Sequence, residues 1–239
     1  MPTNLVNCWK NFIKVKMLSK RLQTLVNLIS SGDFVAADIG TDHGLLPINL
    51  IKNKIVKKVY AVDINVKPLK IAEKNIQKHN FQKEIPTILS DGLAFTTQIS
   101  DEIEYCFLAG LGSGTILEIL NKDNDKIKNY LICSNTEIEQ IRKFTIAKNY
   151  FIQYESFFID QKHRYWLIWI NKQKSAKKLE NIFLGDFKWF EQNLEYKIYL
   201  ENQIQFLEKI FLKIENDEDA KLKLFNKIKQ MKEYVQLWN

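Results

Sequence analysis

The chain alternates short apolar runs with stretches of helical periodicity, and this alternation constrains its fold more than any other feature. The apolar runs lie at 34–37, 58–62, 86–89, 105–109 and 130–133. Helical periodicity covers the stretches around them, at 18–29, 45–53, 68–79, 115–121 and 136–149. Strands that alternate with helices pair in parallel through right-handed crossovers. Continuous apolar runs are typical of strands covered on both faces. The sequence therefore predicts an α/β fold around a parallel sheet.

The pattern changes after residue 150. Two strand-like runs, 154–159 and 164–170, flank the polar residues 160–163, which predicts an antiparallel hairpin at the end of the sheet. The polar stretch 171–180 marks a boundary. We therefore expect one domain over 18–171 and a second over 172–239. Residues 1–17 are expected to be an N-terminal extension or a misassigned start.

The second domain carries apolar residues at heptad spacing. The first series is Leu200, Ile204, Leu207, Phe211 and Ile214, extended upstream by Phe187, Phe190 and Leu194. After the polar segment 215–219 the period resumes at Leu224 or Phe225, then Ile228, Met231 and Val235. Two helices joined by a short break predict an α-helical coiled-coil hairpin. The same seam is compatible with a dimer, so the oligomeric state stays open.

A glycine-rich turn follows the first predicted strand. It reads Asp38-Ile39-Gly40-Thr41-Asp42-His43-Gly44 and matches neither the dinucleotide-binding pattern nor the phosphate loop of nucleotide triphosphatases. Gly40 and Gly44 let a ligand lie close to the main chain at the carboxyl edge of the sheet. An acid two residues before the first glycine suits a ligand with a cationic amino group, such as S-adenosylmethionine.

Two further acids follow the next two strands. Asp63 lies 25 residues beyond Asp38, where an acid can accept hydrogen bonds from both hydroxyls of a ribose. Asp91 follows the third strand and can accept from an adenine amino group. Each acid alone is as readily explained as a helix or turn cap. Three acids at three consecutive strand ends, beside the glycine-rich turn, predict a Rossmann-like class I methyltransferase domain.

Charge and composition limit the kinds of partner and site that we expect for this chain. The net charge is +7, and residues 1–30 carry five bases and no acid. A one-sided basic segment is typical of a phosphate-rich partner, although a solvated surface explains the count equally well. Three cysteines without a C-x-x-C pair and three histidines argue against a metal centre. No apolar run approaches the length of a membrane span or a secretory signal, so we expect a cytoplasmic protein.

Four segments together resemble the bacterial tRNA adenine(22)-N1-methyltransferase family. They are LSKRLQTL, ADIGTDHGLLP, SDG and LAGLGSG, and the resemblance runs from about residue 17 to the end of the chain. It implies S-adenosylmethionine as methyl donor, N1 of an adenine in tRNA as acceptor, and a helical coiled-coil domain after the methyltransferase domain. The chain departs from the family at Gly110-Leu111-Gly112-Ser113, where Gly-Met-Gly-Gly is usual, and at Cys133-Ser134-Asn135, where Gln-Pro-Asn is common. Asp63 stands where the family often has Glu.

The expected site residues fall into three groups. The cofactor is expected to contact residues of the first helix and of four strand ends: Arg21, Asp38, Gly40, Asp42, His43, Gly44, Asp63, Ile64, Asp91, Gly92, Ala109 and Gly110. The RNA is expected to contact Lys20, Gly112, Asn135, Lys223 and Lys227. Methyl transfer to N1 makes the base cationic, so we name the polar groups Asn135, Asp42 and His43 as catalytic candidates.

Methyl transfer from a sulfonium requires alignment more than acid–base chemistry. Adenine N1 supplies its own lone pair, which agrees with the absence of a nucleophile motif in the sequence. Because N1 lies on the Watson–Crick edge, the base must be exposed or flipped into the site.

Two other functions stay open. One is an enzyme of the same fold that acts on another RNA base or on a small molecule. The basic N-terminus argues against a small molecule. The absence of a [DN]-P-P-[YF] motif after the fourth strand argues against methylation of exocyclic amines. The other is a non-catalytic scaffold that uses its coiled coil to engage a partner.

Overall fold

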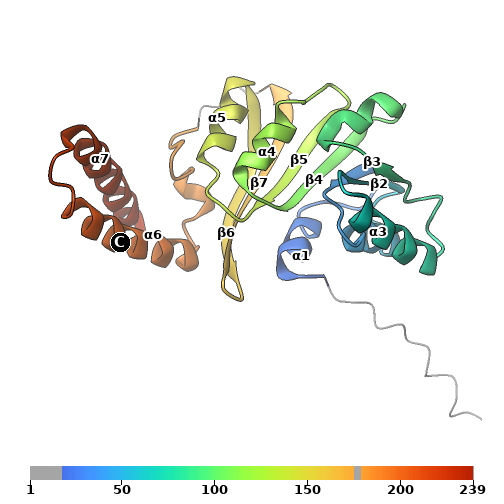
Figure 1. Cartoon of the computed structure of the whole chain (residues 1–239), viewed down its shortest axis with the longest axis horizontal. Helices are drawn as coiled ribbons and strands as arrows, with labels where there is room; N and C mark the ends of the chain where they lie inside the picture. Colours follow the sequence, from blue (N-terminus) through green and yellow to red (C-terminus); the bar gives the residue numbers. More distant parts are fainter. Residues whose placement is uncertain (1–17, 175–178, 239) are drawn as a thin grey trace, which may run out of the picture.

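The computed structural model describes residues 18–174 and 179–238, and the predicted extension at 1–17 lies outside them. The core is a seven-stranded sheet of order β3-β2-β1-β4-β5-β7-β6 (Figure 1). Its strands are β1 Val35–Ile39, β2 Lys58–Asp63, β3 Thr87–Leu89, β4 Ile103–Leu111, β5 Ile127–Ser134, β6 Tyr150–Asp160 and β7 His163–Lys174. The first five are parallel and β7 runs antiparallel to β5, as the sequence predicts. All five residues of β1 are buried because helices cover both faces of the sheet.

The helices form two layers. One layer holds α1 Lys20–Val26, α2 Leu45–Lys52 and α3 Val66–Lys78, whose apolar side chains share one core cluster with Ala36, Phe107 and Leu167. The opposite layer holds the 3₁₀ helix η1 Gly92–Gln98, α4 Ser113–Leu120 and α5 Glu139–Ala147. Strands β2 and β3 are added on one side of β1, and β4 and β5 on the other, so the strand order changes direction between β1 and β4. Crevices at such a reversal bind ligands beyond the carboxyl ends of the strands.

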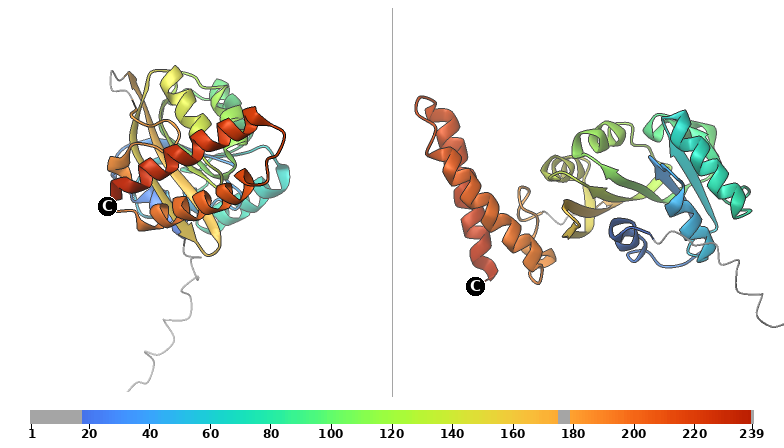
Figure 2. Two further views of the ribbon diagram at one scale, coloured as in Figure 1. Left: turned by 90° about the vertical axis from the view of Figure 1, so that its left-hand side faces the viewer. Right: turned by 60° about the horizontal axis from the view of Figure 1, so that its bottom comes forward.

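The C-terminal segment forms the predicted helical hairpin. Helices α6 Leu194–Phe211 and α7 Glu218–Val235 begin at Asn193 and Asp217, whose side chains accept hydrogen bonds from Tyr196 N and Ala220 N. The two helices pack on each other through a buried seam that includes Leu200, Ile204, Ile228 and Met231. The right-hand view of Figure 2 shows the hairpin at one end of the molecule, with α3 at the other end.

Part of the predicted seam is wrong. Leu194 is 65% exposed, so it does not extend the seam, and Phe187 lies in the short 3₁₀ helix η2 Phe187–Trp189. Ile214 follows the end of α6. Of the two candidates that begin the second series, Leu224 packs inward and Phe225 is exposed.

Strand β7 continues to Lys174, past the predicted domain boundary at residue 171, because main-chain pairing with β6 carries on through polar residues.

A buried ion pair attaches the hairpin to the sheet. Arg142 Nε donates to Glu155 Oε1 at 2.8 Å, and Arg142 Nη1 donates to the carbonyl of Phe183 at 2.8 Å. From the other side, the hydroxyls of Tyr196 and Tyr234 donate to the carbonyls of Leu184 and Gly185. The segment before η2 is thus held between the sheet and both helices of the hairpin.

Replacing Arg142 by Met is expected to destabilise the protein strongly. Glu155 would remain fully buried without a counter-charge, and removing one partner of a buried pair costs about 3–5 kcal/mol. Urea unfolding measures the loss, with Lys143→Met as the control because that neighbouring side chain is half exposed. The double variant Arg142→Met/Glu155→Met should recover part of the stability. An Arg142→Met variant as stable as the control would show that the pair does not hold the junction.

Candidate active site at the carboxyl edge of the sheet

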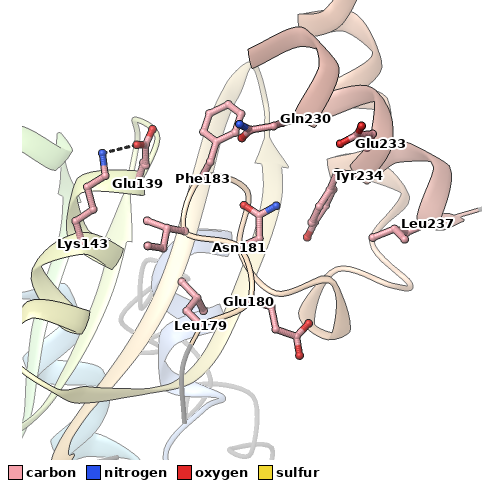
Figure 3. A pocket seen from close by; sticks show the side chains of 11 residues that line it. Glu139, Lys143, Leu179, Glu180, Asn181, Phe183, Gln230, Glu233, Tyr234 and Leu237 are labelled. Carbon is pink, nitrogen blue, oxygen red and sulfur yellow. Dashed lines mark ion pairs between the residues drawn. The ribbon is translucent and has the colours of Figure 1, made fainter. Parts of the chain in front are cut away.

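A cleft of about 420 Å³ opens at the carboxyl edge of the sheet, beyond the neighbouring strands β1 and β4. Its walls come from the start of α1, the glycine-rich turn after β1, Ala109 of β4 and the turn between β6 and β7. A larger pocket, of about 610 Å³, lies between α5, the segment 179–183 and α7 (Figure 3). Its polar side chains include Glu139, already paired with Lys143, and Asn181. The buried carboxyl group of Asp38 and the glycine-rich turn line the smaller cleft, so the chemistry points there.

Asp38 is the buried acid of this cleft. It is the fourth residue of β1, inside the strand, with 4% of its surface exposed. Thr41 Oγ1 donates to Asp38 Oδ2 at 2.8 Å. Burial raises the pKa of Asp38 to about 7, although the hydrogen bond from Thr41 and the charge of Arg21 act in the opposite direction. A buried carboxylate of this kind is costly to ionise until a cation arrives.

Arg21 supplies the opposite charge. A side chain at Gly110 would place its Cβ 2.6 Å from Arg21 Nη1, and Gly110 has a φ of +84°. Glycine at 110 therefore lets the guanidinium lie against β4. Within the described residues, Arg21 Nε is buried and has no hydrogen-bond partner. An acid and a guanidinium in one cleft, with a buried N–H left unpaired, suit a zwitterionic amino-acid group such as the methionine part of S-adenosylmethionine.

The glycine-rich turn leaves room for such a ligand. Gly40 has a φ of +74°, and a Cβ there would meet only Leu111 Cδ2, at 3.8 Å. Gly44, also at positive φ, packs against Ala72 of α3 and precedes α2. The main chain at Gly40 is thus open to close approach, while Gly44 fixes the turn to the next helix.

The other predicted cofactor contacts lie further along the sheet edge, outside the lining of the cleft. Asp63 is buried and accepts hydrogen bonds from Asn65 N at 2.8 Å and Asp42 N at 3.3 Å. It therefore holds the glycine-rich turn in place and keeps further lone pairs for a ligand. Asp91 is exposed and pairs with Lys122. Ile64 is exposed after β2, and Gly92 is buried against Ile119 at the start of η1.

Asp42 and His43 stand at the mouth of the cleft. Their side chains are 66% and 41% exposed, with His43 Nε2 3.7 Å from Asp42 Oδ1. The turn between β6 and β7 adds Asp160, His163 and Tyr165, which the sequence analysis did not identify. The predicted hairpin was the available signal, since pairing β7 with β5 brings its turn to this edge.

The predicted RNA contacts are divided between distant places. Lys20 donates to the carbonyl of Ile159 at 3.0 Å and so joins α1 to the β6–β7 turn beside the cleft. Gly112 and Asn135 lie together, because a Cβ at 112 would be 3.6 Å from Asn135 Oδ1, but they do not line the cleft.

Lys223 and Lys227 do not join this group. They lie on α7, at the end of the molecule away from α1 (Figure 1). Lys223 pairs with Asp219 at 2.5 Å, and Lys227 stands over the ring of Phe183.

The part of the chain that the structure describes contains neither a metal-binding cluster nor a membrane-spanning helix. No cluster of three or more His, Cys, Asp or Glu residues between 18–174 and 179–238 is placed to hold a metal ion. None of the helices in these ranges is long and apolar enough to cross a bilayer. Cys106 and Cys133 are buried free thiols.

Comparison with known proteins places this geometry in a family. Residues 18–168 match the family model described as methyltransferase domain. The structure of M. capricolum TrmK in complex with S-adenosyl-homocysteine superposes with a TM-score of 0.90 at 44% identity, covering 93% of this chain and 100% of that one. The crystal structure of the B. subtilis m1A22 tRNA methyltransferase TrmK has a TM-score of 0.81 at 22% identity, over 92% of this chain and 99% of that one, and shows the same fold.

Curated sequences agree. The tRNA (adenine(22)-N(1))-methyltransferase of Bacillus subtilis is 30% identical over 136 residues, a match that spans 56% of this chain and just over half, 56%, of that protein. A putative tRNA methyltransferase of Mycoplasma genitalium is 28% identical over 171 residues, or 70% of this chain and 77% of that protein. The chain therefore belongs to the methyltransferase domain family and, within it, to the TrmK family.

Proposed function

We propose that the protein transfers a methyl group from S-adenosylmethionine to N1 of adenine 22 in tRNA. The observation that carries the proposal is the pair of opposite charges, Asp38 and Arg21, in the cleft beside the glycine-rich turn. The TrmK structure that matches this chain holds S-adenosyl-homocysteine, and the curated Bacillus relative is named for adenine 22 of tRNA. The first name supports the methyl donor proposed here, and the second supports the acceptor.

The residues of the cleft would hold the donor by its amino-acid end. The carboxylate of Asp38 would pair with the ammonium group, and Arg21, with its unpaired Nε, would pair with the carboxylate. Gly40 would let the ligand lie on the main chain. Asp63 would accept hydrogen bonds from the ribose, and Ile64, Asp91 and Gly92 at the neighbouring strand ends would border the adenine.

When bound, S-adenosylmethionine supplies an electrophilic methyl group, and the chain's own residues align the acceptor. Ala109 at the end of β4 lines the cleft without a bulky side chain, which leaves space for a flat base, and Gly110 beside it gives room to the guanidinium of Arg21. Asp42 and His43 stand at the mouth, where an incoming base must pass. The carboxylate of Asp42 would offset the positive charge that N1 methylation creates. Alignment and charge compensation are thus the contributions that we assign to the protein.

Incubation with labelled S-adenosylmethionine and an unmodified tRNA, followed by nucleoside analysis, tests this function. We expect N1-methyladenosine, and we expect none when guanine replaces the adenine at position 22. A different methylated nucleoside would favour the alternative of a same-fold enzyme with another RNA base as substrate. Cofactor binding without transfer to any tRNA would favour a small-molecule substrate. A folded protein that neither binds the cofactor nor transfers methyl would favour the scaffold.

Cofactor affinity is expected to fall on acidification below pH 7. Asp38 must be ionised to pair with the ammonium group, and its pKa in the free protein is about 7. Below that value a proton must leave before the ion pair can form, so the dissociation constant should rise about tenfold for each pH unit. Titration calorimetry in two buffers of different ionisation enthalpy measures both the affinity and the released proton. A constant affinity from about pH 5.5 to 7.5 would contradict the assignment of Asp38.

The proposed substrate also bears on location. A tRNA partner is met in the cytoplasm, and we propose that the protein acts there. This agrees with the finding that the described helices include none suited to cross a membrane.

A further inference from the structure

A further pocket, of about 520 Å³ and distinct from the one in Figure 3, lies on the opposite face of the sheet from the cofactor cleft, and we call it the second pocket. Strand β7 separates the two. His163 and Tyr165 line the cleft, whereas the alternate residues Arg164 and Trp166 line the second pocket. Successive side chains of a strand point to opposite faces. The core agrees, because Tyr165 packs with the α1–α3 layer and Trp166 with the α4–α5 layer.

The walls of this pocket come from both parts of the protein. Ser113 and Asn135 stand at the carboxyl edge after β4 and β5, and α6 of the hairpin adds Tyr199 and Gln203. The pocket is therefore a place where one ligand can touch the sheet and the hairpin together. It also contains Asn135, which the sequence analysis expected to contact RNA.

The polar groups of the pocket suit a nucleobase. The guanidinium of exposed Arg164 stands 5.3 Å from the centre of the Tyr199 ring, and Tyr199 is fixed by a 2.6 Å hydrogen bond from its hydroxyl to Glu137. Arg164 forms no ion pair with any residue that the structure describes. Unstacked RNA bases are commonly held by stacking on arginine and aromatic planes and by hydrogen bonds to their edges.

The amide groups complete this set. The side chains of Asn135 and Gln203 line the same pocket and make no side-chain hydrogen bond within 18–174 and 179–238, so both remain available to a base edge. A phosphate fits less well, because Glu137 and Glu139 place carboxylates in the same wall.

We propose that this pocket binds a second unstacked base of the RNA, the neighbour of the methylated adenine in the nucleotide chain. The inference rests on the proposed function. The methylated adenine itself must reach the cofactor cleft, and the second pocket opens on the other face of β7, so it takes a different nucleotide. The hairpin is then part of the RNA site through Tyr199 and Gln203, not through the lysines of α7.

Substitution of Arg164 tests the pocket. Arg164→Ala should raise the KM for unmodified tRNA about tenfold or more, the effect of losing a stacked base, while the dissociation constant for S-adenosylmethionine stays unchanged. Arg164→Lys keeps the charge but loses the plane and should behave like Arg164→Ala. Lys128→Ala is the matched control, since this half-exposed lysine lies near the amino end of β5 and pairs with Glu102. An Arg164→Lys variant with the wild-type KM would indicate that Arg164 contacts a phosphate, and it would overturn the proposal that the pocket binds a base.

Abasic substrates identify the nucleotide. Unmodified tRNAs that lack the base on the 5′ or the 3′ side of adenine 22 are compared with intact tRNA, using wild-type protein and Arg164→Ala. For one of the two, the lost base should raise the wild-type KM but add little to the effect of Arg164→Ala, because both changes remove the same contact. Additive effects at both positions, or an unchanged KM for Arg164→Ala, would overturn the inference. Absence of transfer by the wild-type protein would instead refute the proposed function.

Discussion

Asp38→Asn is expected to raise the dissociation constant for S-adenosylmethionine about 100-fold or more. The substitution keeps the shape of the side chain, removes its charge and replaces one acceptor oxygen by an NH2 group, at a position where 4% of the surface is exposed. Losing one partner of a buried, hydrogen-bonded charge pair costs about 2–5 kcal/mol of binding free energy. Isothermal titration calorimetry with the cofactor, near pH 8, where Asp38 of the wild-type protein is ionised, measures the change.

The same variant should fold at least as stably as the wild-type protein. The pKa of Asp38 is raised from 3.8, the value of an ordinary aspartate, to about 7, so the ligand-free protein loses stability as the pH rises from the first value through the second. An asparagine carries no such charge. Asp33→Asn is the control, since Asp33 is exposed and pairs with Lys57 at the surface. If Asp38→Asn bound the cofactor as well as Asp33→Asn, the assignment of Asp38 would be wrong.

Arg21→Met should weaken cofactor binding by a similar factor, through two separate effects. The carboxylate of the cofactor loses its charged partner, which costs about 2–5 kcal/mol. The charge of Arg21 also helps to keep the pKa of Asp38 from rising further. Without it, Asp38 holds its proton to higher pH, and less of the protein is ready to bind the ammonium group at neutral pH.

These two effects can be distinguished by pH. Raising the pH should restore the part of the affinity that depends on ionised Asp38, and it should leave the part that depends on the lost guanidinium. Lys20→Met is the control on the same helix, because Lys20 contacts Ile159 and not the cleft. Equal cofactor affinity of Arg21→Met and Lys20→Met would show that the guanidinium takes no part in binding.

Much of the fold was predictable because its main signals are local. The continuous apolar runs identify the parallel strands, and the glycine-rich turn identifies the edge where ligands bind. Lengths were less accurate. The strands of the hairpin were expected at 154–159 and 164–170, whereas β6 and β7 span Tyr150–Asp160 and His163–Lys174. Their ends carry polar residues that pair through the main chain, and a hydropathy pattern does not register such pairing.

Most of the expected residues that line the cleft belong to one segment, and Arg21 and Ala109, which the sequence analysis also named, join them from α1 and β4. Asp38, Gly40, Asp42 and His43 are neighbours in the sequence, and they line one cleft. Arg21 against Gly110 is a contact between α1 and β4 that needs the folded chain, as does the arrival of His163 at the cleft. Asn135 shows the opposite case. Its place after β5 put it at the correct edge of the sheet, but the face on which it lies follows from packing.

Reverse transcription of tRNA after incubation with the protein tests the central claim most directly, because a methyl group on N1 blocks Watson–Crick pairing and stops the polymerase. Unmodified tRNA is incubated with S-adenosylmethionine and either the wild-type protein or Asp38→Asn, and the extension products are mapped. We predict a stop at adenine 22 with the wild-type protein and read-through with Asp38→Asn. Read-through with both proteins, or an equal stop with both, would contradict the claim that the Asp38 cleft methylates this adenine.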